Sequence, residues 1–211
     1  MKFILGKKLN MTQIFAEDGK RVSVSAVAAG PCYVTQIKTK DINGYDAAQI
    51  GFGEVKETRL SKPERGHLKK SGKFLRKTAE FRISADALKE SGLKIGGTVL
   101  ATAFQEGERV QVTGVSKGKG FQGVVRRHGF SGSPATHGHK DQLRMPGSIG
   151  ATNPQRVTKG KKMAGRMGND TVTVKNLQII KVDGEKNILY IKGAIPGARG
   201  AFIKIKGIRK M

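Results

Sequence analysis

Residues 114–123 read Gly-Val-Ser-Lys-Gly-Lys-Gly-Phe-Gln-Gly and open the basic segment Gly114–Gly168, around which the chain is organised. The segment holds eleven Lys and Arg against one acid, Asp141, with twelve of the chain's 29 Gly and three of its six Pro. Its large apolar residues stand singly or in pairs, with neither a period of 3.6 nor a sustained period of 2. Burial of its own apolar surface cannot offset an ordering entropy of about 1–2 kcal/mol per backbone residue. We therefore expect a polyanion to order it, with glycines that let the backbone approach that partner closely.

The rest of the chain is strongly basic as well. The 211 residues carry a formal net charge of +24, and removing the +10 of the basic segment leaves +14. Charge of this size opposes compactness unless counter-charge is supplied, so we predict a permanent acidic partner. Nucleic acid is the leading candidate and an anionic membrane surface the rival. The rival is weakened because no apolar run approaches about 18 residues and no basic amphipathic helix is evident.

The cysteine content and the first residues bear on compartment. Cys32 is the single cysteine, which excludes an internal disulfide and cysteine-based zinc ligation and agrees with a reducing compartment. The apolar patch Phe3–Leu5 ends at Lys7 and Lys8, well short of the apolar core of a signal peptide. We expect a cytoplasmic protein without membrane association.

Outside the basic segment, short strand signals alternate with tight turns. Residues 21–28 alternate strictly between apolar and small or polar side chains, as in a half-buried strand. Turn chemistry recurs at Asp18-Gly19, Asn43-Gly44 and Asp183-Gly184. One short helix is expected over 84–90, with Ser84 as its N-cap. The pattern predicts a mainly β fold with little helix, in which a small closed barrel dominates.

The domain organisation follows from where the basic segment interrupts the strands. The strands on either side of it, 110–115 and 171–182, fit as neighbours in the barrel. We therefore predict one β-barrel domain formed by 1–115 and 169–211 together, with 116–168 as an extended arm. A long connection of this kind is usually functional. A second basic insertion, about 55–77, is looped or briefly helical; we expect it to touch the same polyanion, with a solvated loop as the alternative.

A glycine motif in the arm resembles nucleotide-binding loops. Gly118, Gly120 and Gly123 satisfy G-x-G-x-x-G, but 124–128 allows one helical turn at most and no βαβ unit surrounds the motif. A phosphate-binding P-loop fails too, because Gly120 stands where Ser or Thr should bind magnesium. The favoured interpretation is that glycine N–H groups and lysines cradle RNA phosphates.

Metal binding and catalysis are not supported. The spacing of His128, His137 and His139 with Asp141 matches no zinc pattern, and RNA stacking or hydrogen bonding suits these histidines better. Nothing positions an acid or an oxyanion hole near the serines of this region. We predict a protein that is not an enzyme, with no cofactor, no metal and no small-molecule substrate.

Six blocks of sequence carry a resemblance to a known family. They are Gly6–Lys8 with Met11, Thr12, Ile14 and Phe15; Gly114–Phe121 with Gly123; Thr136–Gly138; Pro146–Gly150; Lys159–Gly165 with Met167 and Gly168; and Gly193–Gly197. In this order they resemble the bacterial large-subunit ribosomal protein L-three family along essentially the full chain. The resemblance implies a translation-protein-type β-barrel on the large ribosomal subunit and an arm threading through ribosomal RNA toward the peptidyl transferase centre. It also implies an early role in subunit assembly, and ribosomal proteins L-fourteen and L-nineteen as neighbours.

Two positions depart from the family pattern. Asn10 stands where the family usually has glycine, and asparagine tolerates positive φ better than most residues. Residues 151–155 are shorter than, and different from, the family stretch that carries a methylated glutamine; Gln155 is the candidate position, and its modification stays open.

The sequence thus predicts a structural RNA-binding protein of the ribosome. Pro146–Gly150 is the most turn-like point near the middle of the arm, so we expect the arm to double back there. The tip near the peptidyl transferase centre would comprise Ser148, Ile149, Gly150, Ala151, Thr152 and Asn153. The alternatives are a free nucleic-acid chaperone or nucleoid-type protein that binds any polyanion, and, less favoured, a nucleotide-binding enzyme. The expected RNA-binding residues are Lys117, Lys119, Arg126, Arg127, His137, Lys140, Arg144, Arg156, Lys159, Lys161, Lys162 and Arg166.

Overall fold

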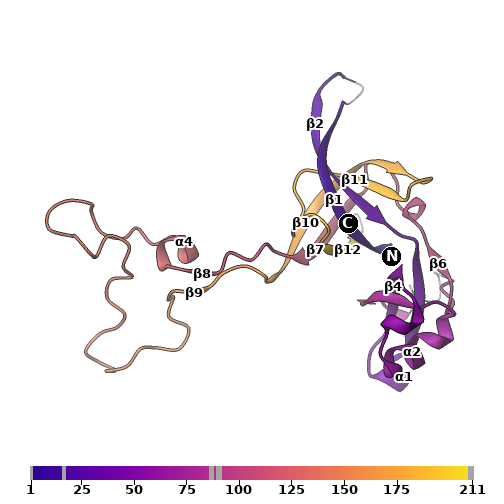
Figure 1. The fold of residues 1–211 in the computed structure, drawn as a ribbon, viewed down its shortest axis with the longest axis horizontal. Coiled ribbons are helices and arrows are strands. Elements are labelled where there is room, and N and C mark those ends of the chain that lie inside the picture. Colours follow the sequence, from indigo (N-terminus) through magenta and orange to yellow (C-terminus); the bar gives the residue numbers. More distant parts are fainter. Residues whose placement is uncertain (1, 16–17, 86–87, 89–91, 209–211) are drawn as a thin grey trace. The chain divides into compact units, whose positions relative to one another are not determined.

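The computed structural model describes residues 2–15, 18–85, 88 and 92–208. They form two compact units (Figure 1). Residues 1–115 and 171–211 make up the first, which we call the barrel unit, and residues 116–170 make up the second, the arm unit. The helix expected over 84–90 lies largely outside the described residues.

Six antiparallel strands of the barrel unit close into a barrel in the order β1, β12, β7, β10, β11, β2. This confirms the predicted mainly β fold with a small closed barrel and little helix. The strands are β1 (Phe3–Phe15), β2 (Arg21–Ala29), β7 (Arg109–Val115), β10 (Thr171–Asp183), β11 (Ile188–Lys192) and β12 (Phe202–Gly207).

Buried and more exposed side chains alternate with a period of two along the strands of this barrel. Along β7, Val110 and Val112 are fully buried while their neighbours are at least partly exposed, and Ile203 and Ile205 follow the same rule on β12. Since successive side chains of a strand point to opposite faces, one face of each strand fills the barrel interior.

The two strands that flank the arm unit are hydrogen-bonded neighbours, as predicted. β7 and β10 pair from Thr171 opposite Val115 to Gln178 opposite Arg109, with a register shift between Val174 and Leu177. The chain therefore leaves the barrel at Val115 and returns to the adjacent strand at Thr171.

A second sheet, of four strands in the order β5, β4, β3, β6, belongs to the same unit. Its strands are β3 (Cys32–Lys38), β4 (Ala47–Glu54), β5 (Leu75–Arg82) and β6 (Thr98–Val99). It shares the barrel's hydrophobic core, because the Phe3 and Phe81 rings stack with centroids 4.7 Å apart. The sequence predicted strands here but did not separate them from the barrel.

Helices are short throughout the described part of the chain. They are α1 (Lys40–Asn43), α2 (Lys62–Leu68) and α4 (Val124–His128), with 3-10 turns η1 (Glu57–Arg59), η2 (Lys69–Ser71) and η3 (Ala101–Ala103). The start of α2 is fixed by the Glu64 carboxylate, which accepts hydrogen bonds from the Ser61 N–H at 2.9 Å and the Ser61 hydroxyl at 2.8 Å. These bonds lower the pKa of Glu64. No helix within the described ranges is both long and apolar enough to cross a membrane.

Candidate nucleic-acid interface

The arm unit begins and ends in a paired neck, residues 116–122 with 165–170. The Ser116 N–H donates to the Asp170 carbonyl at 2.9 Å. Further along, the Lys119 N–H donates to Met167 O at 2.9 Å and the Met167 N–H to Gly120 O at 3.0 Å. The neck ends in the two-residue strands β8 (Phe121–Gln122) and β9 (Gly165–Arg166). Several of its backbone polar groups thus have partners within the chain, and its exposed side chains remain available to a binding partner.

The neck is closed at its far end by α4. The Arg127 guanidinium donates to the Met163 carbonyl at 2.6 Å, and His128 Nε2 lies 2.9 Å from the same oxygen. Gly165 packs against this guanidinium so closely that a Cβ there would lie 2.7 Å from Arg127 Nη1. The sequence predicted Arg127 as a phosphate contact; the structure gives it an internal partner, while its other N–H groups keep their donor capacity.

Beyond Arg127 and Met163 the chain forms two loops. The Ser133 N–H donates to the Leu143 carbonyl at 3.0 Å, which closes a first loop over residues 134–142. Gly132 has φ +74 and its missing Cβ would meet the Leu143 oxygen, so only glycine fits at this closure. Within the loop, His137 and Gly138 adopt positive φ and turn the chain.

The second loop spans residues 151–155. It is bounded by Gly150 and Arg156, since a Cβ on Gly150 would lie 3.6 Å from the Arg156 oxygen. Ile149, just before this loop, instead lines a hollow of about 410 Å³ together with Val124 and Met163. Pro146–Gly150 thus directly precedes the second loop, and the arm contains a further loop, over residues 134–142, that the sequence did not predict. The predicted tip divides, with Ile149 beside α4 and Ala151–Asn153 on the second loop.

The predicted RNA-binding side chains are exposed, except that Arg127 is half-buried. The arm unit's acids are Asp141 and Asp170, against eleven Lys and Arg. Of the ion pairs formed within the described ranges, none includes a cation of the arm unit. Its positive charge is thus almost entirely uncompensated.

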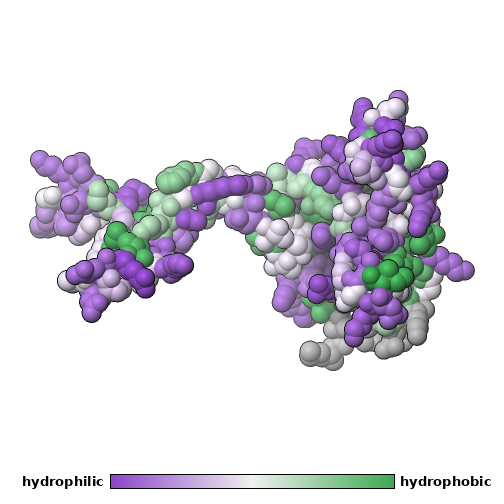
Figure 2. Space-filling model, turned by 90° about the horizontal axis from the view of Figure 1, so that it is seen from below, coloured by the Kyte–Doolittle hydropathy of each residue, from purple (hydrophilic) through white to green (hydrophobic). Residues whose placement is uncertain are grey.

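Apolar side chains are exposed among these cations. Figure 2 shows a mainly hydrophilic surface with apolar patches over the arm unit. The most exposed is Phe121, at 76 %. The remaining large apolar side chains exposed in the unit are Leu143, Met145, Ile149, Val157 and Met163. A surface that combines free cations with exposed rings and methionines suits a partner with phosphates and flat base faces.

The structure bears on the alternative chemistries too. The helix after Gly123 is five residues long, which confirms that the long helix of a dinucleotide site is missing. Across the residues that the structure describes, no three His, Cys, Asp or Glu side chains gather in a way that could hold a metal ion.

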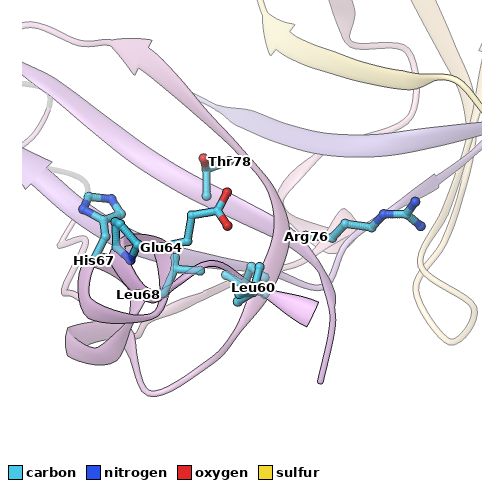
Figure 3. A pocket seen from close by; sticks show the side chains of 8 residues that line it. Leu60, Glu64, His67, Leu68, Arg76 and Thr78 are labelled. Atoms are coloured by element: carbon cyan, nitrogen blue, oxygen red, sulfur yellow. The ribbon is translucent and has the colours of Figure 1, made fainter. Parts of the chain in front are cut away.

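The insertion at 55–77 contains α2 and adds a second basic surface on the barrel unit. Lys62, Lys69, Lys70, Arg76 and Lys77 are exposed there. Beside α2 lies a hollow of about 280 Å³, lined in part by His67, whose Nε2 is 2.6 Å from Gln49 Oε1 (Figure 3). The sequence indicated the charge of this insertion but not the hollow.

In this chain two neighbouring strands of a closed β-barrel are connected by a paired, glycine-rich arm whose cations are uncompensated. This combination is typical of one class of protein, the structural components of nucleoprotein assemblies. Comparison with known sequences makes the assignment specific. The sequence model of the family described as "Ribosomal protein L3" matches residues 80–187. The chain belongs to the ribosomal protein L3 family.

Relatives match over nearly the full length. The chain is 49% identical over 214 residues to "Large ribosomal subunit protein uL3" of Chlorobium phaeovibrioides, with all of both chains covered. It is 48% identical over 208 residues to the protein of that name from Herpetosiphon aurantiacus, covering 98% of this chain and 96% of the relative. For Heliobacterium modesticaldum the identity is 50% over 206 residues, covering 97% and 96%.

Membership of this family tests several predictions made from the sequence. The protein is a structural ribosomal protein and not an enzyme, and its place is the ribosome in the cytoplasm. The predicted family, the non-enzymatic role and the location are confirmed.

Proposed function

We propose that the protein binds large-subunit ribosomal RNA, with the barrel unit as anchor and the arm unit as an insert that neutralises phosphates deep in the folded RNA. The observation that carries the proposal is the uncompensated charge of the arm unit, eleven Lys and Arg against two acids. Each cation that meets a phosphate releases condensed counterions, so such an arm gains affinity from entropy.

The paired neck supports the same proposal. Its backbone bonds between Ser116 and Asp170 and between Lys119 and Met167 hold the two legs together without a partner. Ordering that exists before binding lowers the entropic cost of association. The stretch 129–162, which contains the two loops, carries the remaining cations, and close RNA contacts would complete its order. His137 lies in the first loop.

The family resemblance supplies the finer placement. We propose that the second loop, with Ala151, Thr152 and Asn153 on it, reaches toward the peptidyl transferase centre. An early assembly role and contacts with ribosomal proteins L-fourteen and L-nineteen belong to the same proposal. Gln155 lies two positions after Asn153, and its exposed side chain leaves it accessible to a modifying enzyme.

A salt titration tests the proposal. Binding to large-subunit RNA fragments is compared with binding to a matched scrambled RNA between about 50 and 200 mM salt. Neutralising Lys159, Lys161 and Lys162 to Gln should lower the magnitude of the log-log slope by about 2 to 3, at about 0.7–0.9 per contact. Preference for the cognate fragment should persist, because the barrel unit still selects the site.

The control variant neutralises Lys181, Lys186 and Lys192, which lie on or between β10 and β11 and are exposed. A smaller slope change is expected there. An equal change in both triple variants, with no preference between the two RNAs, would support the free nucleic-acid chaperone instead.

A further inference from the structure

We infer that a cleft of the barrel unit, between the barrel and the four-stranded sheet, binds one unstacked nucleotide of single-stranded RNA. Its phosphate would lie on Lys7, Arg76 and Lys77, and its base against Phe52 and Phe202. The inference rests on the proposed RNA-binding function and adds to it a base-binding site formed by residues of the barrel unit alone.

Strand pairing gives each wall of the cleft one cation and one ring. On the barrel wall, Lys7 of β1 stands directly opposite Phe202 of β12. On the sheet wall, Phe52 of β4 stands directly opposite Lys77 of β5. Residues opposite each other on neighbouring strands project on the same face, so each cation lies beside its ring. All four side chains line the cleft, with Arg76.

The cations of the cleft have no acidic partner to compete with a phosphate. Within the described ranges, none of Lys7, Arg76 and Lys77 forms an ion pair. The Arg76 side chain extends away from Glu64, the acid of the neighbouring hollow (Figure 3).

The acid that lines the cleft, Glu54, is already engaged. Its carboxylate accepts hydrogen bonds from Lys73 Nζ at 3.0 Å and the Tyr33 hydroxyl at 3.1 Å. The Lys73 bond is the main cause that lowers the pKa of Glu54, followed by the Tyr33 bond. Glu54 therefore carries a charge that Lys73 compensates, and the three cleft cations remain in excess.

Size and ring placement favour a nucleotide over other anions. The cleft measures about 570 Å³, within the range of about 300–1,000 Å³ typical of small-ligand sites. Phe52 and Phe202 are half-buried and pack against the hydrophobic core, which holds both rings in place. Proteins that bind single-stranded RNA combine cations that contact the phosphates with aromatic rings on which the bases stack. An acidic peptide would engage the cations but would leave the rings unused.

The absence of tryptophan from the sequence provides a direct test. In a Phe202→Trp variant, a single-stranded RNA hexamer should quench the new fluorescence, and a duplex of equal length should not. Phe15→Trp is the control, since Phe15 is 66 % exposed on β1 and does not line the cleft. Quenching by both RNA forms, by neither, or equally at both tryptophan positions would overturn the inference.

A second measurement does not depend on the reporter. Anisotropy of a labelled hexamer should show that Phe52→Leu weakens binding roughly 5- to 150-fold, the effect of losing one stacked base. Lys7→Ala and Lys77→Ala should each lower the salt slope by about 0.7, while the matched Lys186→Ala variant leaves it unchanged. Unaltered affinity in Phe52→Leu, or stronger competition from poly-glutamate than from the hexamer, would rule out a base site.

These failures can be told apart from failure of the proposed function. If the full chain still prefers its ribosomal RNA fragment while the cleft variants behave as wild type, the cleft assignment falls and the ribosomal role stands. If the full chain shows no preference, both fall.

Discussion

Replacing Gly168 by alanine should open the neck of the arm unit and leave the barrel intact. Gly168 has φ +77, and a Cβ there would meet the Lys117 carbonyl oxygen. That atom belongs to the backbone of the opposite leg, so the clash cannot be relieved by turning a side chain. The neck bonds between Lys119 and Met167 must therefore stretch or break.

The size of the expected destabilisation follows from two contributions. A non-glycine residue in the left-handed region costs about 1–2 kcal/mol. Loss of one or two neck hydrogen bonds adds about 1 kcal/mol each. Gly168→Ala should thus destabilise the neck locally by about 2–4 kcal/mol. Gly160→Ala is the matched control, because Gly160 has φ +82 but no heavy atom within 4 Å of its missing Cβ.

Amide hydrogen exchange measures the difference site by site. The Lys119 and Met167 amides should exchange about 30- to 1,000-fold faster in Gly168→Ala, the equivalent of 2–4 kcal/mol. They should keep their protection in Gly160→Ala. The Val112 amide, at a fully buried barrel position, should be unchanged in both. Equal exchange of the neck amides in the two variants would refute the argument that a backbone contact at Gly168 constrains the neck.

Three further predictions concern the barrel unit. Ile203→Ala removes a fully buried barrel side chain and should lower the free energy of unfolding by about 2–5 kcal/mol in a denaturant titration, whereas Ile42→Ala, at a position 85 % exposed, should leave it within experimental error. Burial raises the pKa of Cys32 to about 12, so the native thiol should resist a disulfide reagent at pH 8 and react at once in denaturant; prompt reaction of the native protein would contradict its burial. The hydrogen bond from Lys38 lowers the pKa of Glu80, so the Lys38–Glu80 pair stabilises the fold above the ordinary glutamate pKa, and this stabilisation is lost as the pH falls through the lowered pKa. Glu80→Gln should therefore reduce the loss of unfolding free energy at acid pH. An unchanged pH dependence of stability would count against this ion pair.

Local patterning was enough to predict the pairing at the root of the arm. The alternation of 110–115 and the long strand signal after Thr171 identified two barrel strands, and the barrel closes with them side by side. The second sheet could not be separated in the same way, because alternation of period 2 is identical in either sheet. What separates them is the strand pairing, which closes six strands into the barrel and leaves β5, β4, β3 and β6 as a sheet of their own. The two are then joined by the packing of Phe81 on Phe3, which lie 78 positions apart in the sequence.

The arm shows the same division between local and distant information. Its charge and glycine content predicted an exposed basic segment. Its cations are exposed apart from the half-buried Arg127, and none of them forms an ion pair with another described residue. The hydrogen bond from Arg127 to the Met163 carbonyl joins residues that are 36 positions apart. The sequence could not predict it, because the charge of an arginine is equally compatible with a phosphate contact. The glycines of the arm carry a further signal that the sequence analysis did not use, since Gly168 has a positive φ and lies against the backbone of the opposite leg.

Order within the arm unit is therefore graded, and the gradient has a physical consequence for assembly. The neck is held by backbone bonds that exist without RNA, and the Arg127 clamp limits how far its legs can separate. The stretch 129–162 beyond it, which contains both loops, has few internal bonds and carries Lys140, Arg144, Arg156, Lys159, Lys161 and Lys162. A preformed neck reduces the conformational search, while a segment with few internal bonds can adapt to an RNA surface that is still folding around it. Stiffening the loops should raise the affinity for mature RNA and slow incorporation into immature particles. Loosening the neck through Gly168→Ala should instead lower both the affinity and the rate of incorporation.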